Sequence, residues 1–315
     1  MKYIYMAFGY MLNLIYGVVE NYGLAIILLT ILIKIILLPL TLKQQKSMTK
    51  TQKLQPKLQE VMDKYKYDKE RQSQETMKLY KEYGVNPMGG CLPLIIQFPI
   101  LIAFYQVIQK PAQYVLGYTA KEVASLLKDF DISSKVAGAQ IALAEKLGEL
   151  DFGFFGLDLA ATPWDELKAV FAGTAGLIGL TALIIPALSC ITTFLSGKIS
   201  TMMNGKKEKK EEKKAPQRVL SPEQKKNANE NPGEGMAKSM TYFMPLMTLW
   251  LTFTFPAALG LYWTISNVLG LVQNIVLNKY YNRKLALEIE SKDAERQKKI
   301  EEKMKKYNMK KKKRG

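Results

Sequence analysis

Apolar residues are gathered into long runs along this chain instead of being spread evenly over it. A membrane-crossing helix needs roughly 17–25 mostly apolar residues. Runs of that length or longer cover 22–42, 91–109, 174–197 and 240–278. The last run is too long for one helix and has Pro256 near its middle, so we divide it into 240–255 and 257–278, joined by a tight turn. The pattern predicts an all-α membrane protein with five transmembrane helices.

The polar stretches between these runs show patterns of their own. Residues 43–86 are mostly helix-forming, carry two apolar stripes and break near Tyr67–Asp68, which predicts a helical hairpin over 43–90. The alternative is a charged helix pair that only connects two spans, but the stretch is long for a simple link. Residues 198–239 are of low complexity and predict a disordered loop. Within 110–173, short helices are expected at 120–128 and 134–149.

The first 21 residues allow three interpretations. One helical stripe is apolar, and it consists of Ile4, Phe8, Met11, Leu12, Ile15, Val18 and Val19. This amphipathic pattern favours an interfacial helix on the outer membrane surface over 1–21. A signal peptide is disfavoured because no small-x-small cleavage site follows, and an extra span turning at Glu20–Asn21 stays open.

Charge fixes the expected orientation. The chain carries a formal net charge of +17, and segments 43–90, 198–239 and 279–315 hold 11, 11 and 15 of its 45 Lys and Arg residues. Segment 111–173 holds only 5 lysines against 9 acidic residues. The positive-inside rule therefore predicts that the three basic segments are cytoplasmic, that the N-terminus lies outside, and that 279–315 is a basic cytoplasmic tail.

Several classes of chemistry lack their residues in this sequence. No Asp or Glu occurs in the five runs and the chain has no histidine, so proton relays, ion-coupled carriers and serine hydrolases are disfavoured. The phosphate-binding loop GxxxxGK[ST] is missing as well. Cys91 and Cys190, without a histidine, predict neither a zinc site nor a disulfide framework. We expect a protein that is not an enzyme and holds no cofactor or metal.

Lys34 is the exception to the apolar pattern, because it lies inside the first run in ILIKIILLPL. A charge at the centre of a span costs roughly 2.5–3.5 kcal/mol on insertion scales, so the ammonium group needs a polar environment. It could extend along the helix to the cytoplasmic boundary, or it could lie in a water-filled pocket between helices. Polar residues in the spans favour the pocket, and the candidate groove residues are Lys34, Thr30, Gln97, Asn267, Gln273 and Asn274.

Four segments together resemble the YidC membrane insertase family. They are the first run continuing into the hairpin, NPMGGCLPLIIQFPILIAFYQVI at 86–108, FFGLDL at 154–159 and ALGLYWTISNVLGLVQN at 258–274. The absence of a large outside domain is similar to Gram-positive members. The resemblance implies a five-helix core around a hydrophilic groove that is open to the cytoplasm and to lipid. Family members usually have arginine where this chain has Lys34, and lysine keeps the charge but loses the bidentate fork.

The resemblance also implies a function in the bacterial cytoplasmic membrane. We expect insertion of small or single-spanning membrane proteins, alone or beside the Sec translocon, with Phe98, Ile100 and Leu101 forming a hydrophobic slide. Expected partners are nascent membrane proteins, anionic lipids and the ribosome, whose rRNA the basic tail could contact, and a monomer is expected. The alternatives are a passive channel or solute carrier with an anion site at Lys34, and a membrane-anchored ribosome or scaffold receptor.

Overall fold

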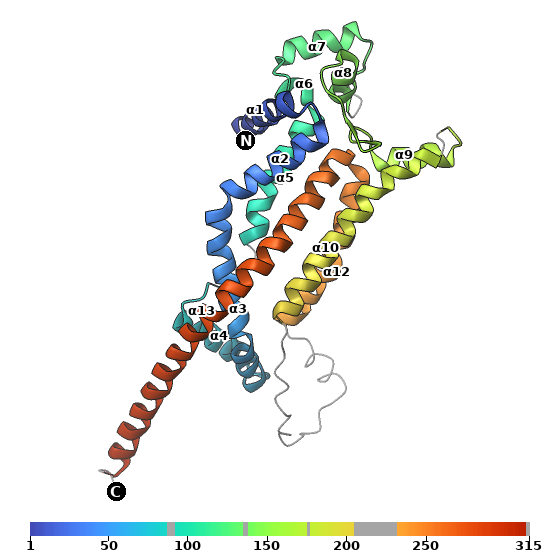
Figure 1. Cartoon of the computed structure of the whole chain (residues 1–315). Helices are drawn as coiled ribbons and strands as arrows, with labels where there is room; N and C mark the ends of the chain where they lie inside the picture. Colours follow the sequence, from blue (N-terminus) through green and yellow to red (C-terminus); the bar gives the residue numbers. More distant parts are fainter. Residues whose placement is uncertain (87–91, 135–137, 175–176, 205–231, 313–315) are drawn as a thin grey trace. The chain divides into compact units, whose positions relative to one another are not determined.

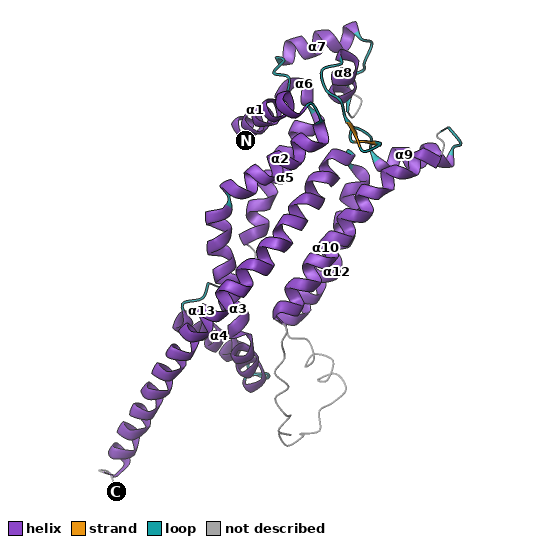
Figure 2. Cartoon of the chain, viewed as in Figure 1, coloured by secondary structure: helices purple, strands orange, loops and turns teal. Residues whose placement is uncertain are grey.

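The computed structural model describes residues 1–86, 92–134, 138–174, 177–204 and 232–312. Apart from one two-stranded β-hairpin, the regular structure in these ranges is helical, as expected for an all-α membrane protein (Figures 1 and 2). The helices are α1 (Lys2–Val19), α2 (Tyr22–Ile36), α3 (Leu38–Lys64), α4 (Lys69–Tyr83), α5 (Leu92–Gln109), α6 (Pro111–Tyr114), α7 (Ala120–Asp129), α8 (Ala139–Leu147), α9 (Pro163–Phe171), the 3₁₀ helix η2 (Leu177–Leu183), α10 (Ile184–Asn204), α12 (Pro232–Thr254) and α13 (Ala257–Lys312). The strands are β1 (Gly153–Phe154) and β2 (Leu157–Asp158).

The chain divides into two compact units. The first, called the core unit, comprises Met1–Pro39, Pro93–Glu208 and Pro232–Gln273. The second, called the hairpin unit, comprises Leu40–Leu92, Lys209–Asn231 and Asn274–Gly315. The boundary between the two units falls inside α13, so this one helix contributes its first part to the core unit and the remainder to the hairpin unit.

The core unit is held together by apolar faces of α1, α2, α5 and α13. On α2 the buried side chains recur at helical spacing, as Tyr22, Ile26, Leu29 and Ile33. Phe104 of α5 stacks on Tyr262 of α13, with ring centroids 3.9 Å apart. Burial on this face explains why the first apolar run forms a stable helix next to its neighbours, whatever surrounds its other face.

Helix α1 buries the stripe that the sequence singles out. Phe8, Met11, Ile15 and Val19 pack against the core cluster and Leu12 is fully buried, whereas Ile4 and Val18 are exposed. The exposed face of α1 is also apolar, with large side chains that include Tyr3, Met6, Tyr10 and Leu14. The predicted stripe therefore faces mainly protein. The interfacial position of α1 stays a prediction, in which the opposite, exposed apolar face would contact the membrane.

The apolar runs form helices whose ends differ from the expected ones. Among the described residues, Leu180–Ile199 and Ala257–Tyr281 are each long and apolar enough to cross a membrane, and the broken pair α2–α3 gives a third candidate if it counts as one span. Ile95–Gln109 and Phe243–Thr254 are apolar but shorter. Helix α10 continues to Asn204 and α12 starts at Pro232, so the helical residues 198–204 and 232–239 fall in the predicted disordered loop. The rest of that loop, 205–231, lies outside the described residues.

Local sequence signals set several other boundaries. Helix α12 ends at Thr254 and α13 starts at Ala257, so the chain turns at Pro256 as the sequence suggests. Helices α7 and α8 lie where short helices are expected, and α7 starts with a capping box between Thr119 and Glu122. In the hairpin unit, α3 ends at Lys64 and the Asp68 side chain caps α4 by accepting a hydrogen bond from the Arg71 amide.

Candidate functional site

Lys34 lies in the last turn of α2, and its side chain is half-buried. Helix α2 is fixed at its start by Asn21, whose side-chain oxygen accepts a hydrogen bond from the Leu24 amide at 2.9 Å. No carboxylate in the described part of the chain forms an ion pair with Lys34. The ammonium group therefore depends on water, lipid headgroups or a bound segment for its polar contacts.

Thr30 lies one helical turn before Lys34 and is buried. Its hydroxyl donates a hydrogen bond to the Ile26 carbonyl oxygen at 2.7 Å, so its proton is used within α2. A hydroxyl oxygen can still accept a hydrogen bond while it donates one. Thr30 could thus present only an acceptor to a neighbouring polar group.

Two of the predicted groove amides are joined to other helices. Gln97 of α5 donates a hydrogen bond to the Tyr262 hydroxyl at 2.6 Å, and Asn267 of α13 donates one to the Thr193 hydroxyl at 2.7 Å. Polar side chains that bond between helices hold membrane helices together. These amides therefore have a structural role whether or not they also line a groove.

The other two candidates are Gln273 and Asn274 of α13. Gln273 has a polar interaction of its own, and Asn274 is half-buried and belongs to the hairpin unit. The hydrogen bonds of Thr30, Gln97 and Asn267 go to Ile26, Tyr262 and Thr193, which are not among the predicted groove residues. The groove stays a prediction, as does the part that each residue has in it.

The structure adds hydroxyl groups that the sequence analysis passed over. Ser189 of α10 lies 2.7 Å from the Thr264 hydroxyl of α13 and donates to the Gly260 carbonyl oxygen at 3.1 Å. Within the described residues, the buried Thr248 hydroxyl and the Trp263 indole nitrogen have no hydrogen-bond partner. Ser189 and Thr193 are four residues apart, as are Thr248 and Thr252, and this spacing in the sequence could have revealed a polar face on each of the two helices.

The three predicted slide residues of α5 differ in exposure. Phe98 is half-exposed, whereas Ile100 and Leu101 pack against the core cluster. Helix α12 exposes Phe243, Leu246 and Trp250, which share one face because they are three and four residues apart. Phe98 and this face of α12 are thus open to their surroundings, Ile100 and Leu101 pack in the core, and the slide stays a prediction.

In the hairpin unit, α13 packs against both arms of the predicted hairpin. Ile289 packs on an apolar cluster formed by Leu54 and Leu58 of α3, Leu79 and Tyr83 of α4, and Val85. Both arms turn their apolar stripes toward this cluster, which is why they fold against each other and against α13.

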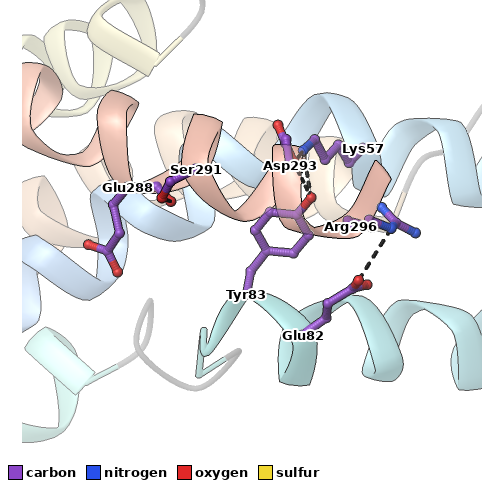
Figure 3. A network of polar contacts seen from close by, with 7 residues as sticks. All are labelled: Lys57, Glu82, Tyr83, Glu288, Ser291, Asp293 and Arg296. Atoms are coloured by element: carbon purple, nitrogen blue, oxygen red, sulfur yellow. Dashed lines mark hydrogen bonds and ion pairs between the residues drawn. The ribbon is translucent and has the colours of Figure 1, made fainter. Parts of the chain in front are cut away.

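Charged groups surround this cluster, and together we call these interactions the hairpin–α13 contact. Lys57 and Tyr83 both donate hydrogen bonds to the Asp293 carboxylate, as Figure 3 shows. Glu82 pairs with Arg296 at 3.3 Å (Figure 3). Lys50 pairs with Glu288 at 2.5 Å. Glu288, Asp293 and Arg296 of α13 thus carry charges opposite to those of their partners in the hairpin.

The local environment shifts the pKa values of these groups. Burial lowers the pKa of Lys57, but hydrogen bonds to Asp293 and Tyr83 outweigh burial and leave it raised. Burial raises the pKa of Asp293, and its bonds with Lys57 and Tyr83 outweigh that effect and leave it lowered. The hydrogen bond from Lys50 lowers the pKa of Glu288. All three shifts favour the charged forms that make the contact.

We expect Lys57→Met and Asp293→Asn each to weaken the hairpin–α13 contact, and the double variant to lose less than the sum. The pair is partly exposed, so the coupling energy should be about 0.5–1 kcal/mol. Hydrogen–deuterium exchange of the α3 and α4 amides in the full-length protein measures it. Glu75→Gln is the matched control, since it removes only the exposed ion pair with Lys78 inside α4. Strictly additive effects would contradict a direct pairing.

The same contact should respond to acid. A carboxylate whose pKa is lowered by folding contributes stability above its unfolded pKa, which is about 4 for Asp and Glu, and loses it as the pH falls through the folded value. Exchange protection factors for α3 and α4 should therefore fall below about pH 4. Asp293→Asn should show a smaller fall, because Glu288, which pairs with Lys50, is then the remaining carboxylate of the contact whose pKa folding is known to lower.

Comparison with known proteins agrees with the resemblance of the motifs. The profile of the family described as "60Kd inner membrane protein" matches residues 14–284. The chain is 31% identical over 268 residues to "Membrane protein insertase YidC 2" of Listeria innocua, covering 84% of this chain and 66% of that protein. It is 34% identical over 275 residues to "Membrane protein insertase YidC" of Mannheimia succiniciproducens, covering 87% and 36%.

A shorter match is more similar. Over 106 residues the chain is 57% identical to "Membrane protein insertase YidC" of Syntrophus aciditrophicus, which covers 34% of this chain and 20% of that protein. The chain thus spans between a fifth and about two thirds of the length of these curated relatives. Since the family profile covers most of the sequence from residue 14 to residue 284, the protein belongs to the 60Kd inner membrane protein family, to which the YidC motifs had pointed.

Proposed function

We propose that this protein is a membrane insertase that places small or single-spanning proteins into the bacterial cytoplasmic membrane. The observation that carries the proposal is Lys34, a half-buried cation on an apolar helix with no ion-pair partner among the described residues. The relatives named as insertases support the proposal, and the matched family profile covers the region that contains Lys34.

The proposed mechanism needs no nucleotide. Five spans enclose a hydrophilic groove, with the N-terminus outside and the C-terminus in the cytoplasm. A short polar segment of the substrate enters the groove, where water, Lys34 and nearby polar side chains replace part of its lost hydration. The apolar segment of the substrate meanwhile moves into lipid along Phe98 and the exposed face of α12. Burial of that segment drives insertion, and the groove lowers the barrier.

The hairpin is proposed to receive substrate. It encloses its own apolar cluster and is joined to α13, so it can act as one folded body in the cytoplasm. Deleting the hairpin would remove the partners of Glu288 and Asp293 as well. Point variants of the hairpin–α13 contact therefore test the hairpin's role with less disturbance of α13.

The test of the proposed function is rescue of a bacterium depleted of its own insertase. We expect this gene to restore insertion of a small single-span reporter protein, measured by protease accessibility of the reporter's outer segment. Reporter left entirely in the cytoplasm, with the protein present at normal abundance, would contradict the proposal. Solute uptake by the purified protein in liposomes would instead support the alternative of a passive channel or carrier.

The end of the tail is expected to increase affinity for translating ribosomes through rRNA phosphates. Most basic residues of 279–315 follow Gln297, whereas Glu288, Asp293 and Arg296 contact the hairpin. A chain that ends at Gln297 should therefore keep the hairpin–α13 contact and lose most ribosome binding. Each neutralised phosphate releases counterions, so the binding lost should be the salt-sensitive part.

Co-sedimentation with ribosome–nascent chain complexes in neutral detergent measures this effect without anionic lipid. The matched control is the full-length Glu75→Gln variant, which alters an exposed charge in the hairpin and should sediment like the unmodified chain. Equal binding of the shortened and intact chains across a salt series would make the tail a lipid-binding segment and would refute ribosome contact.

A further inference from the structure

Three large apolar side chains stand out on one stretch of the core unit, from β1 through α9. Phe155 is 92% exposed, Phe171 83% and Trp164 48%. Large exposed aromatic groups so close in sequence mark a surface that meets another apolar phase or partner. Neither the proposed groove nor the hairpin uses this stretch.

Backbone hydrogen bonds fix the level of the stretch relative to the membrane spans. The Ala257 amide donates to the Ala161 carbonyl oxygen and the Ala258 amide to the Leu159 carbonyl oxygen, both at 2.9 Å. Ala257 is the first residue of the candidate span Ala257–Tyr281. The β1–β2 hairpin precedes this junction and α9 follows it, so both lie where the span begins. Helix α9 also contacts α12 and η2, which lead to the other spans at this end.

Helix α9 has the pattern of a helix that lies in a membrane interface. Trp164, Leu167 and Phe171 share one face, because they are three and four residues apart. Lys168 flanks this face, with its ammonium nitrogen 5.5 Å from the Trp164 ring centroid, and it pairs with Asp165 at 3.0 Å. Trp at the boundary and a flanking lysine are typical of the headgroup region.

The tip of the β-hairpin shows a second, independent sign. Strands β1 and β2 pair Phe154 with Leu157, so Phe155 and Gly156 form a two-residue turn. Both have positive φ, 49° and 77°, as the favoured tight hairpin turn requires. Asn, Asp or Gly usually occupies the first of these positions, and a bulky aromatic residue there is strained. Despite this cost, the turn carries an exposed phenyl ring at its tip.

We propose that Phe155, Trp164 and Phe171 insert into the lipid interface of the leaflet at the α12–α13 turn and hold that end of the core unit at a fixed depth. Lipid is the occupant because α9 contacts α12 and η2, η2 contacts α10, and α10 and α12 themselves expose apolar side chains that include Ile184, Leu188 and Trp250. The proposal needs only that the candidate spans cross a membrane, and it is independent of insertase activity.

Depth-dependent quenching of tryptophan fluorescence tests this inference. The chain has three tryptophans, so Trp250→Phe with Trp263→Phe leaves Trp164 as the sole emitter. The full-length variant is placed in vesicles whose lipids carry bromine either near the headgroup or near the chain ends. We expect shallow bromine to quench Trp164 more strongly than deep bromine, and aqueous iodide to quench it weakly.

A chain with only Trp250 is the matched control. Trp250 lies four residues before the end of α12, which places it about 6 Å further along the span. It should therefore be quenched relatively more by deep bromine. Replacing Phe155 and Phe171 by serine should reduce lipid quenching of Trp164, since two of the three inserted rings are then gone.

Two results would overturn the proposal. Strong iodide quenching of Trp164 without quenching by brominated lipid would show that this surface faces water or a protein partner instead of lipid. A depth of Trp164 equal to that of Trp250 would show that Trp164 does not lie in the interface. An independent readout keeps all tryptophans: a polarity-sensitive dye on Phe155→Cys, in a chain with both native cysteines replaced by serine, should shift to shorter wavelength in vesicles. An unshifted dye emission would count against insertion in the same way.

Discussion

Lys34→Glu is expected to abolish insertion in the rescue assay, whereas Lys34→Arg retains it and Lys34→Ala reduces it. Arginine keeps the positive charge on α2, alanine leaves hydration to water, and glutamate reverses the field that would attract acidic segments. Burying either charge in a span costs roughly 2.5–3.5 kcal/mol, so the glutamate variant keeps the burial cost and loses the attraction. Insertion of a single-span reporter with an acidic outer segment measures the difference.

The comparison requires equal amounts of each variant in the membrane, measured by immunoblot. Lys121→Glu is the matched control, because it makes the same charge change at an exposed position of α7. It should rescue fully. Full rescue by Lys34→Glu at normal abundance would show that the charge of Lys34 has no part in insertion, although family membership would be unaffected.

Gly9→Ala is expected to be the most destabilising single methyl addition in α1. A Cβ atom at Gly9 would overlap the Tyr114 carbonyl oxygen and lie 2.5 Å from the carbonyl carbon. These are backbone atoms of α6 that cannot rotate away, so α1 must move off α6. Such overpacking costs typically 1–3 kcal/mol. Thermal unfolding of the detergent-solubilised protein should show a lower midpoint.

Gly17→Ala in the same helix provides the control. Nothing lies within 4 Å of a Cβ atom built at Gly17. Alanine in an open helical position should be neutral or stabilise by roughly 0.5–1 kcal/mol, because glycine loses more backbone entropy on folding. Equal midpoints for the Gly9 and Gly17 variants would mean that α1 does not pack on α6 in the membrane-extracted protein.

Sequence patterns located most of the helices, because a run of apolar residues long enough to span lipid must satisfy its backbone hydrogen bonds internally. They placed the chain turn at Pro256 and the break in the hairpin before Asp68. They missed helix ends at Asn204 and Pro232, where polar low-complexity residues continue helices that begin or end in apolar surroundings. Composition indicates the conformation that a segment favours in isolation. An adjoining helix can extend into such a segment and outweigh that preference.

Site residues were harder to assign, because polar residue type does not specify a partner. The sequence showed that Gln97 and Asn267 lie in apolar helices, but only the packing of helices showed that Gln97 bonds Tyr262 and Asn267 bonds Thr193. Likewise, a helical stripe on α1 is apolar whether it meets lipid or protein. The choice depends on which neighbouring face fits against it.

The sequence by itself determined the class of protein, the family, the presence of a cation at Lys34 in the first apolar run and the charge distribution that predicts orientation, since each depends on residue type and spacing along one segment. The tertiary structure alone decided which faces are buried and which distant charges meet. The clearest case is the hairpin–α13 contact: Lys57 and Asp293 are separated by more than two hundred residues, and the carboxylate reaches the lysine only because Ile289 packs on the hairpin's apolar cluster.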